Sequence, residues 1–116
     1  MDCMMTRDEI KDFFLSVAFE HGMALTKGDF KKANKLHKKI QALYIKAREC
    51  NQVDLFSELL GESDENVRLW AATFSLKVFP DTAEKALKNL SNSTSITGLS
   101  AKTTLDLWKQ GNLNLL

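Results

Sequence analysis

The fold is decided by residues 63–79, which read SDENVRLWAATFSLKVF. Apolar residues recur in this stretch at steps of three and four, which is the spacing of one side of a helix. Leu69, Ala72 and Leu76 make the remaining sides apolar as well. A helix that is apolar nearly all round is buried, so we expect it to be the central element of the protein. Phe79-Pro80 should end it, because a helix rarely continues into a proline.

A long helical hairpin is predicted on the N-terminal side, over residues 6–50. Thr6 and Glu9 have the spacing of a capping box, which marks the start of a first helix. Gly28-Asp29 then predicts a tight turn, with the glycine ending one helix and the aspartate capping the next. The second helix is expected from Phe30 to about Glu49, antiparallel to the first because the turn is short.

Shorter helices are predicted in the second half of the chain. Residues 53–79 contain a short helix and the central helix, and residues 81–111 contain two more around a polar loop at 91–97. A shift of 30 positions superposes many apolar residues of the two segments, which indicates a degenerate repeat. We therefore expect a single all-α domain over residues 1–116, an α–α superhelix of five to six helices in antiparallel hairpins.

Composition limits the environment of the chain more than its partner. The 116 residues contain one proline and five glycines, and the net charge is only +1. No uninterrupted apolar run exceeds four residues, far short of the roughly 20 that span a membrane. Asp2 stands where a signal peptide needs positive charge, and Cys3 and Cys50 lack metal-type spacing. We expect a cytoplasmic protein with two reduced thiols and no membrane contact.

Two resemblances accompany these patterns. Residues 55–72, LFSELLGESDENVRLWAA, resemble a HEAT repeat, with a leucine-rich helix, an acidic turn and then Val-Arg and alanines. That resemblance implies that Asp64 and Arg68 brace neighbouring units. Most of the chain also resembles the bacterial family called domain of unknown function 2019, which implies a HEAT-like helical fold and no assigned activity. The motifs that carry this resemblance are GDFKKANKL (28–36), VRLWAA (67–72), AEKAL (83–87) and LWKQG (107–111).

Catalytic and metal-binding patterns are absent from the sequence. His21 and His37 are the two histidines, and each falls on the apolar stripe of one helix of the predicted hairpin, so they can approach each other. A zinc site needs about four ligands, and no cysteine or carboxylate pattern supplies the others. We interpret them as core or boundary residues, the alternative being a ligand or proton shuttle. No nucleophile elbow, P-loop or dinucleotide motif occurs. We predict no enzyme, no cofactor and no metal.

A lysine-rich segment is the first candidate contact surface. Six lysines and one acid, Asp29, lie between positions 27 and 39. Four of the lysines share one side of the second helix, namely Lys31, Lys35, Lys38 and Lys39. This side is a candidate docking face for an acidic partner or for phosphates, and the alternative is a solvated outer face. The segment has no arginine, and its single aromatic residue, Phe30, is expected to be buried, which counts against nucleic acid.

An acidic segment is the second candidate. Asp54, Glu58 and Glu62 recur every four residues and predict a negative ridge along the short helix and its exit. Such a ridge is suited to a basic protein, for example a nuclease, because opposite charge speeds encounter. The alternative is again a solvated surface.

The function we predict from these observations is non-catalytic protein binding. The leading hypothesis is a bacterial immunity or antitoxin-type protein that neutralises a cognate toxin by occluding it, through either charged surface. The alternative is a nucleic-acid-binding helical module that uses the lysines of the second helix.

Overall fold

All secondary structure in the described part of the chain is helical. The computed structural model describes residues 5–113, and no strand occurs among them, so the predicted all-α class is confirmed. Five α-helices and one 3-10 helix follow in the order α1 (Arg7–Thr26), α2 (Phe30–Glu49), η1 (Val53–Leu59), α3 (Glu65–Ser75), α4 (Pro80–Leu90) and α5 (Ile96–Lys109).

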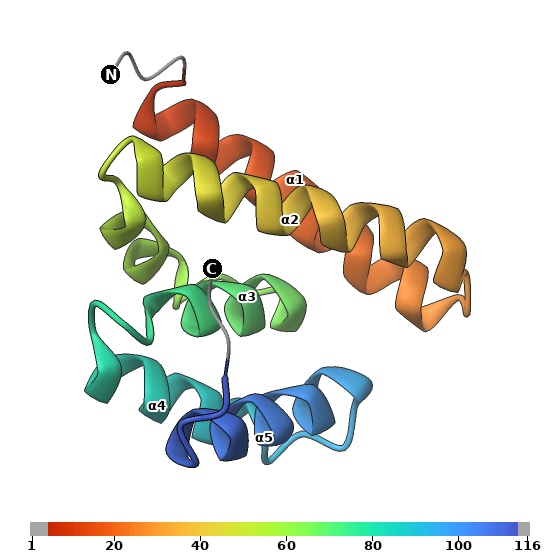
Figure 1. Ribbon diagram of the computed structural model, residues 1–116. Helices are drawn as coiled ribbons and strands as arrows, with labels where there is room; N and C mark the ends of the chain where they lie inside the picture. The colour runs from red at the N-terminus through yellow and green to blue at the C-terminus, as the bar shows by residue number, and fades with distance from the viewer. Residues whose placement is uncertain (1–4, 114–116) are drawn as a thin grey trace.

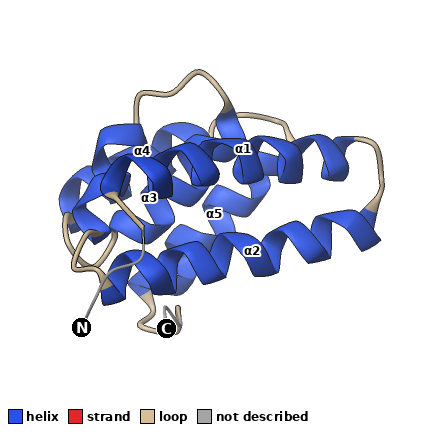
Figure 2. Ribbon diagram, turned by 90° about the horizontal axis from the view of Figure 1, so that it is seen from above, coloured by secondary structure: helices blue, strands red, loops and turns tan. Residues whose placement is uncertain are grey.

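The helices form three layers (Figure 1). The α1–α2 hairpin is the first layer, η1 and α3 form the second, and α4 and α5 form the third. α1 and α2 are antiparallel, and so are α3, α4 and α5 in succession, whereas α2 and α3 run in the same direction with η1 between them. The central helix α3 contacts the hairpin on one side and α4 and α5 on the other. The turn between α1 and α2 lies beyond the ends of α3 and α5 (Figures 1 and 2), so one end of the hairpin overhangs the layers below it.

The hairpin forms as the sequence predicts. The Thr6 side chain accepts a hydrogen bond from the Glu9 backbone N–H at 3.1 Å, and the Glu9 carboxylate accepts one from the Thr6 N–H at 2.9 Å. At the turn, Gly28 has a φ of 74°, a left-handed conformation that favours glycine. The Asp29 carboxylate accepts a hydrogen bond from the Lys32 N–H at 3.2 Å, which caps α2.

An aromatic cluster joins the first two layers at the end away from this turn. Phe14, Tyr44, Phe56 and Phe74 come from α1, α2, η1 and α3, and all four are buried. The Tyr44 and Phe74 rings stack with centroids 4.5 Å apart, and Phe56 meets Phe14 and Phe74 edge-on at 5.0 and 5.1 Å. Such pairs add roughly 0.5–1.5 kcal/mol each beyond the area they bury. This cluster fixes the hairpin on α3.

The central helix is buried on both sides but is shorter than predicted. Residues 71–76 are all buried, because α3 packs against the hairpin and against the leucines of α4 and α5. The helix ends at Ser75 rather than near Phe79, and Val78 and Phe79 are 44% and 40% exposed. The reason is that Pro80, which lacks an N–H, opens α4 instead of merely ending α3. Residues 76–79 are therefore used for the turn.

The prediction of two reduced thiols is wrong at Cys50, which is disulfide-bonded. A long separation along the sequence does not exclude a disulfide, because bridge formation depends on the distance between two cysteines in space. Cys3 lies outside the described residues. Over residues 5–113, no helix is both long enough and apolar enough to cross a membrane.

Candidate functional site

A cavity of about 440 Å³ opens beneath the overhanging end of the hairpin. Its walls come from α1, α2, α3 and α5, and its volume falls in the range of roughly 300–1,000 Å³ typical of ligand pockets. None of the described residues that line it is a lysine, arginine, aspartate or glutamate. We call it the histidine cavity, after His21 and His37, which line it together with Asn66 and Trp70.

Three polar aromatic rings meet in this cavity. The ring centroids of His21 and His37 are 6.0 Å apart, which confirms that the two histidines approach each other across the hairpin. Trp70 of α3 lies against both, 5.7 Å from His21 and 5.0 Å from His37. All three contacts are edge-to-face, the arrangement that opposes a ring's positive edge to another's negative face.

Asn66 of α3 orients His21. Its side-chain nitrogen donates to the Ala18 carbonyl at 2.6 Å and lies 3.0 Å from His21 Nδ1. An amide nitrogen has only donors to offer, so His21 Nδ1 is the acceptor and its proton is assigned to Nε2. Gly22 permits this approach, because a Cβ at that position would lie 2.9 Å from the Asn66 Cβ.

Two polar atoms in the wall of the cavity have no hydrogen-bond partner. Asn66 Oδ1 and Trp70 Nε1 are buried and bond to none of the described residues. Buried polar groups are hydrogen-bonded in more than about 90% of cases, so each such atom calls for an explanation. The first is an acceptor and the second is a donor, so one group of each kind is left unpaired within residues that line the cavity.

Both histidines are held in the neutral form. Burial lowers the pKa of His21 below its ordinary value, and the nearby His37 lowers it further. Burial also lowers the pKa of His37. A neutral imidazole carries one donor and one acceptor. Among residues 5–113, no group of three or more histidine, cysteine or acidic side chains is placed to hold a metal ion.

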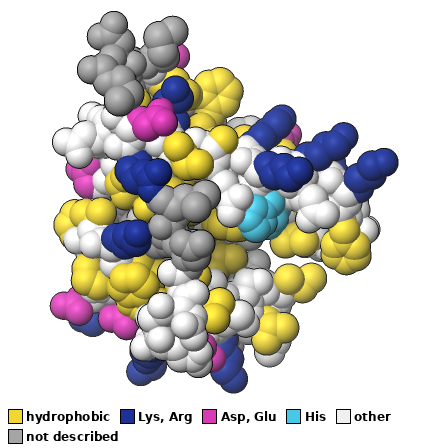
Figure 3. Space-filling model, viewed as in Figure 1, with side chains coloured by type: hydrophobic (Ala, Val, Ile, Leu, Met, Phe, Trp, Pro, Cys, Tyr) yellow, Lys and Arg dark blue, Asp and Glu magenta, His cyan; other side chains and the backbone are white. Residues whose placement is uncertain are grey.

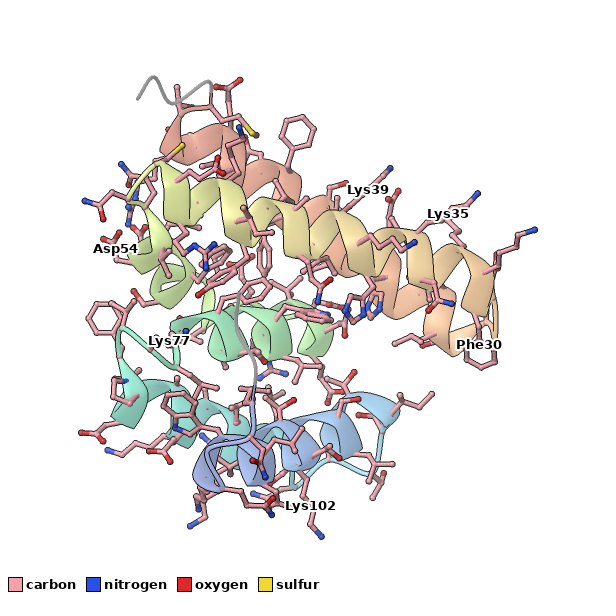
Figure 4. The ribbon with its side chains drawn as sticks, in the orientation of Figure 1. Phe30, Lys35, Lys39, Asp54, Lys77 and Lys102 are labelled. Carbon is pink, nitrogen blue, oxygen red and sulfur yellow. The ribbon has the colours of Figure 1, made fainter. Side chains whose placement is uncertain are left out.

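One side of α2 follows the cavity. Phe30, Asn34, His37 and Gln41 are spaced by four, three and four residues, and all four line it. The prediction that Phe30 is buried is wrong, because it is 62% exposed. Figure 4 shows Phe30 at the overhanging end of the hairpin, beyond the reach of the lower layers, so neighbouring helices cannot cover the ring.

The next side of α2 carries the predicted lysines. We define the lysine face as Lys27, Lys31, Lys32, Lys35, Lys38 and Lys39, all of which are exposed. Lys31, Lys35 and Lys38 lie opposite the buried stripe of the helix, and Lys35 and Lys39 point away from α3 and the layer beneath it (Figure 4). Basic side chains gather along this part of the molecular surface (Figure 3). No residue of the lysine face forms an ion pair with the described part of the chain.

The acidic residues of η1 are used inside the chain. Arg7 of α1 pairs with Asp54 at 3.2 Å and with Glu58 at 2.7 Å, while Lys11 approaches Glu58 at 3.9 Å. The hydrogen bonds that Arg7 donates to Asp54 and then to Glu58 raise the pKa of Arg7 above its ordinary value. Glu62 is exposed and takes no part in this cluster. The structure therefore does not bring the three acids together as one free ridge, whereas it leaves the lysine face open.

Sequence reasoning placed both histidines correctly but missed the residues around them. Asn66 and Trp70 belong to α3, where the sequence predicts only apolar core residues and polar residues that cap the N-terminus. A usable signal existed in α2, where the amides Asn34 and Gln41 flank His37 at helical spacing on one side. A row of polar side chains beside the buried stripe of a helix indicates a surface between the core and open solvent, such as the wall of a cavity.

These features define an all-helical, three-layer domain with a neutral cavity and a lysine-rich side. Residues 8–109 match the family described as Domain of unknown function (DUF2019), so the chain belongs to this family. The crystal structure of the protein RPA1889 from Rhodopseudomonas palustris CGA009 is similar, with a TM-score of 0.87 and 25% sequence identity over 98% of each chain. No curated protein matches the chain.

Proposed function

We propose that this domain is a non-catalytic protein-binding module whose partner docks an acidic surface on the lysine face. The observation that carries the proposal is the contrast in pairing between the two charged surfaces. The lysine face is exposed and unpaired within the described residues, whereas Asp54 and Glu58 are held by Arg7. The nearby Asp29 is used to cap α2.

The energetics of α2 favour such a partner. Lys31 and Lys35, and Lys35 and Lys39, are like-charged pairs at i, i+4, and each pair costs a few tenths of a kcal/mol. An acidic surface relieves this repulsion and speeds association at low salt. Phe30 at the end of the same helix supplies an exposed aromatic anchor, the residue type on which binding energy concentrates.

Within this class we propose an immunity or antitoxin-type role, in which the domain neutralises a cognate toxin in the cytoplasm by occluding it. We also propose that residues 53–79 and 81–111 are degenerate units of a HEAT-like superhelix. The stacking of helix on helix in layers supports this description, because stacked helical units expose long sides suited to covering another protein.

The test is a binding and protection assay with charge-matched variants. The triple variant Lys31→Glu, Lys35→Glu, Lys38→Glu should lose at least tenfold in affinity for the product of a neighbouring gene and should no longer protect cells that express it. The control, Lys85→Glu, Lys88→Glu, Lys102→Glu, makes the same charge change at exposed lysines of α4 and α5. Equal behaviour of the two variants would contradict the lysine face, and failure of the unmodified protein to protect would end the immunity role.

Nucleic-acid binding is the second candidate, and the exposure of Phe30 favours it. A solvent-exposed ring beside six lysines is a combination that binds phosphates and stacks bases. Fluorescence anisotropy with duplex and single-stranded DNA and RNA at two salt concentrations separates the candidates. A phosphate-binding protein should lose affinity steeply with salt and should weaken on Phe30→Ala for single strands. The protein-binding proposal expects no salt-sensitive binding of DNA or RNA, and it expects Phe30→Ala to weaken the protein partner instead, because the ring serves there as an anchor.

A further inference from the structure

We propose that the histidine cavity binds a small, uncharged, planar heteroaromatic molecule of the nucleobase type, with a hydrogen-bond donor and an acceptor side by side on its edge. This proposal goes beyond protein binding and does not depend on it. It rests on the charge, the ring geometry and the unpartnered polar atoms of the cavity.

The charge of the cavity excludes most ions. None of the lining residues in the described chain is acidic or basic, and its two histidines are neutral. A charged ligand would lose its hydration without gaining an opposite charge, which is costly. Two imidazoles alone also fall short of a metal site, which needs three or four ligands. The occupant that fits is therefore uncharged.

The rings of the cavity favour a flat occupant. His21, His37 and Trp70 meet edge-to-face, and Phe74 lies behind Trp70 with its centroid 5.6 Å away. Aromatic side chains pack favourably with a further ring, either stacked with an offset or edge to face. Stacking of a base on an aromatic side chain contributes about 1–3 kcal/mol, whatever the base. A bulky aliphatic molecule gains no such contact.

The polar groups of the residues that line the cavity determine which hydrogen-bonding groups the ligand must have on its edge. Trp70 Nε1 is a donor and Asn66 Oδ1 an acceptor, both buried and unpartnered within the described residues. His21 Nε2 is assigned a further donor, and the amides of Asn34 and Gln41 line the same wall. Amide side chains pair with adjacent donor and acceptor groups, as they do with adenine. A hydrocarbon ring would leave these groups unsatisfied, which costs affinity.

The experiment is a titration followed by NMR at pH 7.5. The probes are adenine, uracil and benzimidazole, with cyclohexanol as the non-planar control and benzoate as the charged control. At least one heteroaromatic probe should saturably shift the indole N–H signal of Trp70, while Trp108, which does not line the cavity, stays unchanged. The absence of a saturable shift with all three probes up to their solubility, or equal shifts with the controls, would overturn the proposal.

Matched variants locate the binding. The double variant Asn34→Leu, Gln41→Leu replaces two exposed residues of the wall and should weaken the best probe at least fivefold without unfolding the protein. Trp70→Phe, which removes the indole N–H, should weaken it too. Lys35→Glu is the control on the lysine face of the same helix and should bind normally. Unchanged affinity in the double variant would refute the site, and this result is independent of partner binding, which the lysine variants test.

Discussion

The two ends of the α1–α2 hairpin consist of the same two helices packed on the same central helix. They differ in the surroundings of their aromatic rings. At the closed end, Phe14, Tyr44, Phe56 and Phe74 pack on one another and are at most 4% exposed. At the open end, the rings of His21, His37 and Trp70 meet with similar spacing but border a cavity. The chain concentrates stability at one end and leaves polar groups accessible at the other.

The cause of the difference is coverage. At the closed end η1 lies over the aromatic cluster, and Arg7 ties α1 to η1 through Asp54 and Glu58. At the open end the hairpin extends past α3 and α5 (Figure 1), and the rings of His21, His37 and Trp70 border the cavity instead of packing under a further helix such as η1. Where coverage ends, polar side chains replace apolar ones.

The largest effect is expected from truncating the closed end. Phe56→Ala removes a fully buried ring and should lower the free energy of unfolding by about 3–5 kcal/mol, measured by urea denaturation. The control is Phe13→Ala, whose ring is 55% exposed and which should change stability by no more than about 0.5 kcal/mol. Similar losses in both would mean that the aromatic cluster does not hold the hairpin on α3.

A smaller effect on stability is expected from removing the ion pairs between α1 and η1. Arg7→Ala removes the pairs with two carboxylates and a 2.6 Å hydrogen bond to Gln52, and should cost about 1 kcal/mol at low salt. The loss should shrink in high salt, because these partly exposed charges are screened. Arg48→Ala, at an exposed arginine with no ion pair in the described chain, should be nearly neutral. A salt-independent loss would assign the effect of Arg7 to packing.

The open end should make stability depend on pH. Since the folded pKa of both His21 and His37 lies below the ordinary 6.5, the unfolded chain takes up protons first as the pH falls. The free energy of unfolding should therefore be constant above that value and should decrease as the pH drops through it toward the lower folded pKa values. Denaturation curves between pH 7.5 and 5 measure this slope. His21→Gln with His37→Gln should flatten it, and an unchanged slope would refute the assignment.

The smallest effect on stability is expected on the lysine face. Lys35→Glu should change the free energy of unfolding by less than about 0.5 kcal/mol, with a small gain if anything, because it removes repulsion from Lys31 and Lys39. Thermal denaturation measures the change. A clear destabilisation would mean that Lys35 supports the fold rather than standing free for a partner.

The comparison also explains which features the sequence could predict. The bounds of α2 agree with the prediction because local groups determine them, namely the Gly28 turn and the Asp29 cap. Helical periodicity gives the angle of a residue around its axis but not how far the neighbouring helices extend. For that reason the periodicity predicts Phe30 on the buried stripe, although the side chain is 62% exposed.

The cavity was harder to foresee because it depends on contacts between helices. His21 and His37 are predictable as neighbours from the antiparallel hairpin. The bond from Asn66 to the Ala18 carbonyl joins residues 48 positions apart, and no local pattern reports it. Trp70 looked like one more apolar residue of the central helix, since periodicity does not distinguish a ring that packs from a ring that also carries an unused N–H.

Gly22 limits how far this protein can be improved by thermostabilising design. A glycine inside a 20-residue helix normally gives up about 0.5–1 kcal/mol relative to alanine, so a designer would replace it. Here the added methyl would meet the Asn66 Cβ at 2.9 Å and push apart the two helices that hold the imidazole of His21 in place. Alanine at this position would therefore disturb the contact by which Asn66 orients His21, whatever the helix gained in intrinsic stability.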